Sequence, residues 1–340
     1  MSTHKKKYTI GIDVGGTKIL AAVLDGAFRI QSEVKMKTRP EKGLARFLVD
    51  VHDCVRQVIA EAKIKRSAIV GVGVGCPGMI DAERGIITAS PNIPFLRNLP
   101  LARLLARRIG LPVTLCNDVQ TGLYGEHQFG AAKGYDNAVG IFMGTGIGGA
   151  LVLNGQLYRG ATGSAGEVGH IMVDPEGPVC GCGHHGCLEA LAGRHVIAAE
   201  AALAVARQKA PHLADKTGTD IRQIKSGAMA RAIKAGDRAI EDLIRRKARL
   251  VGQVMANLIN IINPDVIVLG GGVVEAMGGI ILREAERAMR ERSIGASSRH
   301  AKVVAAKLKD YSIVMGAAKR AWDLFGARSA AHGAPKHSNG

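Results

Sequence analysis

One short pattern occurs twice in this chain, and it restricts the fold more than any other feature of the sequence. The segment from Tyr8 to Gly26 reads as strand, glycine-rich turn and strand, and it contains IGIDVGGTKILAAVLDG. The segment from Val139 to Gly155 repeats the pattern as VGIFMGTGIGGALVLNG, with its glycines at a constant offset (140 − 11 = 129; 144 − 15 = 129). Each copy predicts a β-hairpin, so we expect a fold built by duplication.

Similar elements follow the two hairpins. In the first half, residues 43–65 predict a long amphipathic helix and residues 68–75 an apolar strand that runs into glycine. In the second half, apolar residues with helical spacing end before Asn263-Pro264, and residues 266–269 predict the strand. Apolar strands that alternate with helices are typical of buried parallel sheets. We therefore expect an α/β chain with two duplicated lobes and a cleft between them.

The turns of the two hairpins predict a phosphate site. A glycine-rich turn exposes backbone N–H groups, and two such turns facing one another would clasp a polyphosphate from both sides. Neither turn fits the dinucleotide fingerprint or the GxxxxGK[ST] phosphate loop. A single turn of this kind would be weak evidence, and simple turn glycines stay an alternative.

A second feature is a cluster of soft ligands. Three thiols and an imidazole lie close together in the sequence: His170, Cys180, Cys182 and Cys187. This set suits tetrahedral Zn²⁺ in a structural site, and the glycines at 181, 183 and 186 permit a tight wrap around an ion. The alternatives are reduced buried cysteines or a disulfide. His184 and His185 compete for the imidazole position.

Two carboxylates border this cluster, Glu167 and Glu189. A loop held by zinc can fix such groups rigidly, and rigid acceptors bind hydroxyl groups. Solvated charges are the alternative for both residues, and Glu189 could instead be the acid of a helix N-terminus.

Composition excludes several classes of protein. The 340 residues are 47% hydrophobic and 22% charged, which favours a globular protein with two lobes. Only 4% are aromatic, which argues against a stacking surface for single-stranded nucleic acid. The net charge of +17 is dispersed over predicted helices, where a solvated face is typical, so we expect no specific nucleic-acid partner.

The sequence also predicts a cytoplasmic protein. It has no run of about 18 apolar residues and no cleavable apolar segment near Lys5–Lys7. Three of its six cysteines belong to the predicted metal site, and Cys54, Cys76 and Cys116 lie in apolar surroundings, as reduced core residues do. We expect no membrane partner.

Seven motifs occur along the chain in this order: Asp13 to Lys18 (DVGGTK), Gly75 to Gly78 (GCPG), Cys116 to Val119 (CNDV), Gly144 to Gly149 (GTGIGG), Glu167 to His170 (EVGH), Cys180 to Glu189 (CGCGHHGCLE) and Gly270 to Gly272 (GGG). Together they resemble the ROK family of sugar kinases and repressors, in the actin, Hsp70 and sugar kinase superfamily, with a particular likeness to bacterial glucokinases.

The resemblance implies two actin-like (ribonuclease H-like) lobes with the active site in the cleft. The first lobe would comprise residues 1–118 and about 312–328, and the second residues 119–311 with a zinc-binding loop at 167–189. Residues 329–340 would form a flexible tail. The resemblance also implies a homodimer.

The resemblance further implies the roles of individual residues. Asp118 would be the catalytic base; a turn or helix cap is the alternative reading of Asn117-Asp118. Contacts with sugar hydroxyls are implied for Asn92, Asn117, Asp118, Glu167, His170 and Glu189. His170 would bind zinc through one ring nitrogen and donate to a hydroxyl from the other.

The nucleotide side is implied in the same way. Asp13 would hold Mg²⁺, usually through water; a turn acid is its alternative. Contacts with the ATP phosphates are implied for Gly15, Gly16, Thr17, Gly144, Thr145 and Gly146, and contacts with the adenosine for Gly271 and Gly272. Lys18 is left out of this set because it could equally face solvent.

The implied activity is ATP-dependent phosphorylation of a hexose at O6, with glucose as the first candidate. The alternative sugars are N-acetylmannosamine, N-acetylglucosamine and fructose. A non-catalytic, sugar-responsive regulator is the alternative class, although the basic N-terminal extension is only seven residues long and leaves no room for a helix-turn-helix domain. The sequence departs from the family at Phe95 and Leu96, where family glucokinases commonly carry a tryptophan.

Overall fold

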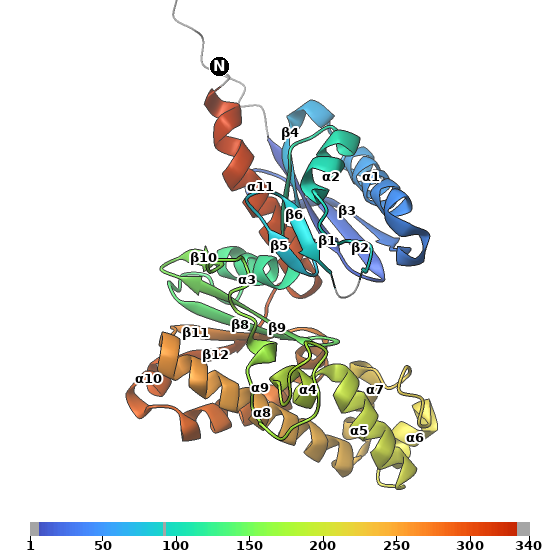
Figure 1. The fold of residues 1–340 in the computed structure, drawn as a ribbon, viewed down its shortest axis with the longest axis vertical. Helices are drawn as coiled ribbons and strands as arrows, with labels where there is room; N and C mark the ends of the chain where they lie inside the picture. The colour runs from blue at the N-terminus through green and yellow to red at the C-terminus, as the bar shows by residue number, and fades with distance from the viewer. Residues whose placement is uncertain (1–6, 91–92, 332–340) are drawn as a thin grey trace, which may run out of the picture. The chain divides into compact units, whose positions relative to one another are not determined.

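In the computed structural model, which describes residues 7–90 and 93–331, the chain forms two compact units (Figure 1). Of the described residues, unit 1 contains those up to Gly130, Arg159–Ser164 and those from Asp310 to 331, and unit 2 contains Ala131–Tyr158 and Ala165–Lys309. The expected division at residue 118 differs from this one, because helix α3 (Asp118–Phe129) packs in unit 1 against helix α11 (Ser312–Ala331). A tail was expected at 329–340. Its first three residues, 329–331, belong to helix α11, and residues 332–340 lie outside the described part of the chain.

The unit 1 sheet has five strands in the order β3-β2-β1-β4-β7. Their bounds are β1 (Tyr8–Val14), β2 (Lys18–Leu24), β3 (Ile30–Lys37), β4 (Ile69–Cys76) and β7 (Val113–Asn117). The pairs β1/β2 and β2/β3 are antiparallel, and the pairs β1/β4 and β4/β7 are parallel. A separate two-stranded sheet contains β5 (Met79–Asp81) and β6 (Ile86–Ala89).

The unit 2 sheet has the same topology, in the order β10-β9-β8-β11-β12. Its strands are β8 (Ala138–Met143), β9 (Ile147–Leu153), β10 (Gln156–Tyr158), β11 (Val266–Gly270) and β12 (Lys302–Ala305). Two antiparallel pairs are again followed by two parallel pairs. The duplicated sheets predicted from the glycine repeat are therefore present.

Helices cover both faces of the unit 1 sheet, and strand β2 shows why. Its residues Ile19, Ala21 and Val23 join the core formed with helix α1 (Gly43–Glu61) and helix α2 (Leu101–Ile109). The intervening residues Leu20, Ala22 and Leu24 pack with Val314 and Ala318 of α11. Alternate side chains of a strand point to opposite faces, so α1 and α11 lie on opposite sides of the sheet.

Helix α11 approaches the sheet and α3 very closely. A Cβ atom at Gly73 of β4 would lie 1.9 Å from the carbonyl oxygen of Ala317, and one at Gly316 would lie 2.0 Å from that of Thr121. Only glycine permits such backbone contact. Because α3 packs against α11, Asp118 at the start of α3 belongs to unit 1.

Unit 2 has a larger helical part. Its helices are α4 (Leu188–Ala192), α5 (Arg194–Ala206), α6 (Pro211–Thr217), α7 (Ser226–Ala235), α8 (Arg238–Ile262), α9 (Gly272–Arg292) and α10 (Gly295–His300). The apolar stripe of α8 packs in the unit 2 core, and α8 ends where Asn263 adopts a left-handed φ of 49° before Pro264. The predicted first helix, 43–65, ends earlier as α1 at Glu61, because Lys63 takes a φ of 53°.

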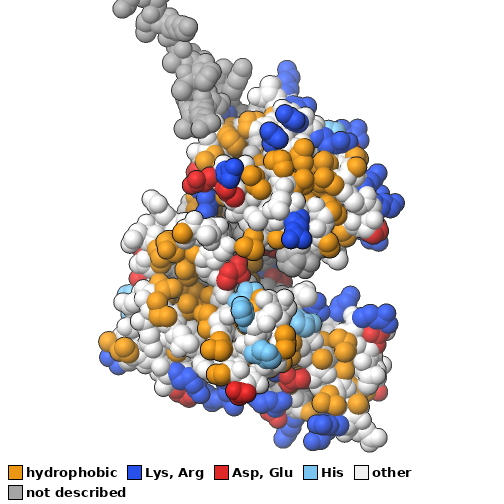
Figure 2. All heavy atoms as spheres, in the orientation of Figure 1, with side chains coloured by type: hydrophobic (Ala, Val, Ile, Leu, Met, Phe, Trp, Pro, Cys, Tyr) orange, Lys and Arg blue, Asp and Glu red, His pale blue; other side chains and the backbone are white. Residues whose placement is uncertain are grey.

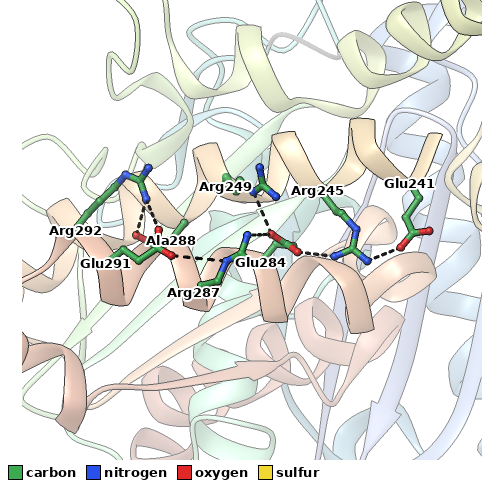
Figure 3. A network of polar contacts seen from close by, with 8 residues as sticks. All are labelled: Glu241, Arg245, Arg249, Glu284, Arg287, Ala288, Glu291 and Arg292. Carbon is green, nitrogen blue, oxygen red and sulfur yellow. Dashed lines mark hydrogen bonds and ion pairs between the residues drawn. The ribbon is translucent and has the colours of Figure 1, made fainter. Parts of the chain in front are cut away.

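An ion-pair network joins α8 to α9 (Figure 3). The carboxylate of Glu284, with 5% of its side chain exposed, lies 2.5 Å from a guanidinium nitrogen of Arg245, 3.1 Å from Arg249 and 2.7 Å from Arg287. Burial would raise the pKa of Glu284, but hydrogen bonds from Arg249 and Arg245 outweigh it and lower this pKa. Arg245 and Arg249 belong to α8 and Glu284 to α9, so these contacts tie the two helices together.

The remaining elements are single turns of 3-10 helix: η1 (Pro40–Lys42), η2 (Arg66–Ala68), η3 (Val168–His170) and η4 (Lys309–Tyr311). None of the helices in the described part of the chain has the length and apolar character needed to cross a membrane. Figure 2 shows Lys and Arg side chains spread over the visible face of each unit, interspersed with acidic ones, as the sequence indicated.

Candidate functional site

The first glycine turn (residues 15–17) joins β1 to β2, and hydrogen bonds to its carbonyl groups hold it in place. The N–H of Gly15 donates to the carbonyl of Lys18 at 2.9 Å. The hydroxyl of Thr38 donates to the carbonyl of Gly15 at 2.7 Å, and the N–H of Thr38 donates to that of Thr17 at 3.1 Å. Among the described residues, nothing accepts a hydrogen bond from the N–H groups of Gly16 and Thr17.

The second glycine turn (residues 144–146) joins β8 to β9 and is arranged similarly. The N–H of Gly144 donates to the carbonyl of Gly146 at 2.9 Å, and His195 Nδ1 lies 2.8 Å from the carbonyl oxygen of Thr145. In the described structure, the N–H groups of Thr145 and Gly146 have no acceptor. These positions correspond to Gly16 and Thr17 by the offset of the repeat (145 − 16 = 129; 146 − 17 = 129). Each turn therefore offers two equivalent donors to an anion.

Two carboxylates lie at the carboxyl edge of the unit 1 sheet. Asp13 lies near the end of β1, which pairs with β4, and β4 pairs with β7, which leads into Asp118. Burial, together with the charge of Asp118, raises the pKa of Asp13 to about 7, and the charge of Lys18 opposes the rise. A cation at this edge would relieve the repulsion.

Lys18 has a partner already. Its ammonium nitrogen lies 3.0 Å from the carboxylate of Asp310, and Lys35 lies 3.9 Å from the same carboxylate. Lys18 at the first glycine turn therefore shares one carboxylate with Lys35.

Asp118 is the first residue of α3 and is half-buried. One of its carboxylate oxygens accepts the N–H of Val119 at 2.9 Å. Asn117 is the N-cap of the helix: its Oδ1 accepts the N–H of Gln120 at 3.0 Å, and its Nδ2 donates to the carbonyl of Gly78 at 3.1 Å. Asn117 thus has a capping role, which the sequence left open, and Asp118 is held at a helix N-terminus.

The structure brings the predicted zinc ligands together. The ligand atoms of His170, Cys180, Cys182 and Cys187 all lie within 4.8 Å of one another. Cys180 Sγ is 3.6 Å from His170 Nδ1, and Cys182 Sγ is 3.6 Å from Cys187 Sγ. Neighbouring donors around a tetrahedral zinc ion lie about 3.6–3.8 Å apart, from Zn–S bonds of about 2.3 Å and Zn–N bonds of about 2.05 Å. The donor set therefore fits zinc, and the sulfur separation excludes a disulfide in this structure.

The local fold explains this geometry. In the cysteine loop (residues 167–189), isolated bridges pair Met172 with Cys187 and Val179 with His185. Gly186 has a φ of 66°, and a Cβ atom there would lie 1.5 Å from the carbonyl oxygen of Asp174. His184 lies outside the ligand set, and His185 Nδ1 is 3.1 Å from the carbonyl oxygen of Gly177. Among the three glycines between the thiols, 183 and 186 have positive φ and 181 does not.

The cysteine loop also positions both predicted acids. Glu189 follows the ligand Cys187 by two residues in α4, and its Oε2 accepts the N–H of Ile147 at 2.8 Å, directly after the second glycine turn. Glu167 precedes η3, and partial desolvation raises its pKa; the charge of His170 lowers this pKa and that of Glu189 raises it. Glu167, His170 and Glu189 thus lie in one electrostatic neighbourhood.

A pocket of about 790 Å³ lies in unit 2 beside the end of β11. Gly270, Met277, Gly278 and Ala306 line it, and the basic side chains of Lys234 and Arg283 lie on its wall. Helix α9 bends here, because Met277 has non-helical dihedral angles. The predicted adenosine glycines, 271 and 272, precede this bend and are not among its lining residues. Position 271 requires glycine, because its φ is 85° and an added Cβ atom would lie 2.6 Å from the carbonyl oxygen of Met143.

Two expectations concern the region around residue 92. Asn92 lies outside the described residues. Phe95 packs edge-on against Phe47 with ring centroids 5.7 Å apart, and Leu96 is fully buried in the unit 1 core. At the place where the family resemblance implies a tryptophan, Leu96 is therefore a core residue, and Phe95 is partly buried and packs against the core.

Comparison with known proteins identifies the chain. A sequence model of the ROK family matches residues 9–323. The chain belongs to the ROK family. The glucokinase of Streptomyces coelicolor is 34% identical to this ROK protein over 316 residues, which cover 91% of this chain and 96% of that enzyme.

Other relatives agree with this assignment. The crystal structure of a ROK family glucokinase from Streptomyces griseus in complex with glucose and AMPPNP shares 34% identity with a TM-score of 0.80, covering 93% of this chain and 99% of that chain. The xylose repressor of Caldicellulosiruptor bescii is 29% identical, with 90% of this chain matching 76% of the repressor. The expected fold class, α/β with two actin-like lobes, is confirmed.

Three residues that contact the glycine turns of this ROK protein were not predicted: Thr38, Arg194 and His195. Thr38 gives no local signal, because it lies 21 residues from Thr17 (38 − 17 = 21) in an ordinary polar stretch. Arg194 and His195 did give one. Both residues lie in the first turn of α5, where the helix dipole favours acidic side chains, so two basic residues at this position are unusual.

Proposed function

We propose that this ROK protein transfers the γ-phosphoryl group of MgATP to O6 of a hexose, with glucose as the preferred sugar. The observation that carries the proposal is the pair of glycine turns, each presenting two N–H donors at equivalent positions. Phosphoryl transfer depends mainly on positioning and on charge stabilisation of this kind. The similarity to the Streptomyces glucokinases supports the choice of sugar.

Asp118 is the general base in this proposal. Its carboxylate takes the proton from the sugar hydroxyl while the oxygen forms a bond to the γ-phosphorus and the bond to the ADP oxygen breaks. Asp13 holds Mg²⁺ through water, which matches its raised pKa, because a cation would stabilise the ionised form. Thr17, Thr145 and Gly146, with the glycines at 15, 16 and 144, bind the phosphates.

Nucleoside binding is proposed for the start of α9. Gly271 is the N-cap of this helix and Gly272 is its first residue, and the neighbouring pocket of about 790 Å³ is large enough for a nucleoside. The basic side chains of Lys234 and Arg283 suit a ligand that carries phosphates.

The sugar hydroxyls bind to acceptors on the cysteine loop and to residues of unit 1. Glu189 has one oxygen on Ile147, so its other oxygen is available to a hydroxyl. His170 has Nδ1 among the zinc ligands, which leaves Nε2 for a sugar. Glu167, Asn117 and Asn92 complete the set.

Zinc, when bound to His170 and the three cysteines, would be structural. It would fix the loop that carries Glu167 and Glu189 and would take no part in the transfer.

A coupled assay of ADP release over glucose, N-acetylmannosamine, N-acetylglucosamine and fructose tests the activity. We expect turnover with ATP and the highest kcat/KM for glucose. A regulator without activity is the second candidate, because the xylose repressor is a relative. Sugar binding by calorimetry without ADP release from any sugar would favour it. Light scattering tests the predicted homodimer.

Replacement of the base is the sharper test. Asp118→Asn should lower kcat by about 10²–10⁴-fold, the usual contribution of general-base catalysis, while glucose affinity stays within about threefold. Near-normal turnover in this variant would contradict the assignment of the base.

A further inference from the structure

Arg194 lies directly against the second glycine turn. Its guanidinium donates to the hydroxyl of Thr145 at 3.0 Å, and its N–H donates to the carbonyl of Gly144 at 3.4 Å. It is the first residue of α5, a 13-residue helix whose N-cap is Gly193. A cation is therefore anchored next to the two N–H groups that the turn leaves available.

The described part of the chain offers the Arg194 guanidinium a hydroxyl partner but no carboxylate. Among the described residues, no carboxylate forms an ion pair with it, whereas Lys18 at the first glycine turn is paired with Asp310. A positive side chain at a helix N-terminus is also unfavourable in the empty protein, because it adds to the positive end of the helix dipole. A bound anion would pair with the guanidinium and would also offset its unfavourable interaction with the helix dipole.

The second glycine turn does not need the Arg194 side chain for its shape. His195 holds the carbonyl of Thr145, and Glu189 holds the N–H of Ile147. Removing the guanidinium would therefore remove a charge and one hydroxyl contact, and these other contacts would still hold the backbone.

We propose that Arg194 binds the phosphates of the nucleotide at the second glycine turn and neutralises charge there during transfer. The proposal rests on the proposed kinase function and adds a cationic ligand to it. Charge-assisted hydrogen bonds from arginine to phosphate are among the strong ones, and they match the spread of charge in phosphoryl transfer. Thr145 would share its hydroxyl and N–H with the same phosphate group.

Nucleotide binding to Arg194 variants tests the proposal without relying on turnover. Calorimetry would compare ADP and adenosine binding to the wild type, Arg194→Gln and Arg194→Lys, with Arg207→Ala as the matched control. Arg207 is exposed at the C-terminal end of the same helix, far in sequence from the turn. Thermal melting would check that each variant is folded.

We expect Arg194→Gln to weaken ADP binding by about tenfold or more, the loss typical of a charge-assisted contact, with adenosine binding unchanged. Arg194→Lys should recover part of the loss, and Arg207→Ala should bind both ligands as the wild type does. In the coupled assay, kcat/KM for MgATP should fall by about 10²-fold or more in Arg194→Gln, with the KM for glucose within about threefold.

Equal losses of ADP and adenosine affinity would show a structural role and overturn the proposal, as would ADP binding within threefold of the wild type. Failure of the proposed function gives a different result. In that case the wild type would release no ADP with any sugar. The loss of ADP affinity relative to adenosine affinity in Arg194→Gln would still test the role of Arg194.

Discussion

Asp13 shows at the scale of one residue how a site can cost stability. Its carboxyl is held beside Asp118 at the edge of a sheet, and burial together with the charge of Asp118 raises its pKa from 3.8 to about 7. A carboxyl with a raised pKa in the folded state destabilises the fold once the pH exceeds its unfolded value. The cost therefore begins near pH 4, grows as the pH rises and levels off above about pH 7.

Asp13→Asn should accordingly stabilise the free protein. Without Mg²⁺, we expect its free energy of unfolding at pH 8 to exceed that of the wild type by about 1–2 kcal/mol, a discounted value for a half-buried group. The advantage should disappear near pH 4, and turnover should be lost. Denaturant unfolding at several pH values in EDTA measures this, and an advantage independent of pH would contradict the explanation.

At the scale of elements, the second glycine turn and the cysteine loop are in direct contact. Glu189, next to the zinc ligands, bonds to Ile147, and a Cβ atom on Gly146 would lie 2.0 Å from Glu189 Oε2. A turn proposed to bind nucleotide thus sets the position of an acid proposed to bind sugar.

Gly146→Ala should therefore damage the sugar side as well as the nucleotide side. The added methyl group must displace the Glu189 carboxylate, so we expect the KM for glucose to rise about tenfold or more, the loss typical of a misplaced charged hydrogen bond. Steady-state kinetics with both substrates measures this effect. Gly181→Ala is the control, because a Cβ atom there meets nothing within 4 Å. An unchanged KM for glucose in Gly146→Ala would show that Glu189 does not act on the sugar.

Zinc should act through the same loop. Freshly purified protein should contain one zinc ion per chain by metal analysis, and Cys182→Ser should lose it, because serine is a poor zinc ligand. We expect this variant to melt at a lower temperature and to show a higher KM for glucose, since Glu167 and Glu189 lose their anchor.

His184→Ala is the matched control for zinc. His184 lies between Cys182 and Cys187 in the sequence but outside the ligand set, so its replacement should retain the metal. Loss of zinc from this variant, or its absence from the wild type, would contradict the assignment of the ligands.

At the scale of the whole molecule, local patterns predicted the sheets well. The glycine repeat predicted two sheets of one topology, and Asn263-Pro264 marked the end of α8. Clustered ligands in a short segment likewise made the zinc site predictable, because chain connectivity alone keeps the three cysteines close.

Long-range packing was not predictable in the same way. The placement of α3 in unit 1 depends on close contact of Gly125 and Gly316 with the opposing helix, and these residues lie 191 positions apart (316 − 125 = 191). The contacts of Thr38 with the first glycine turn depend on where β2 begins and where β3 ends. Neither feature has a periodic or compositional signal, so a single sequence does not reveal it.

The central claim is that two equivalent glycine turns hold one triphosphate while Asp118 accepts the proton of a sugar hydroxyl. A crystal structure of the protein with glucose and a non-hydrolysable ATP analogue tests it most directly. We predict phosphate oxygens within hydrogen-bond distance of the N–H groups of both turns, and glucose O6 within that distance of the Asp118 carboxylate. Phosphates bound away from either turn, or a carboxylate out of reach of O6, would contradict the account.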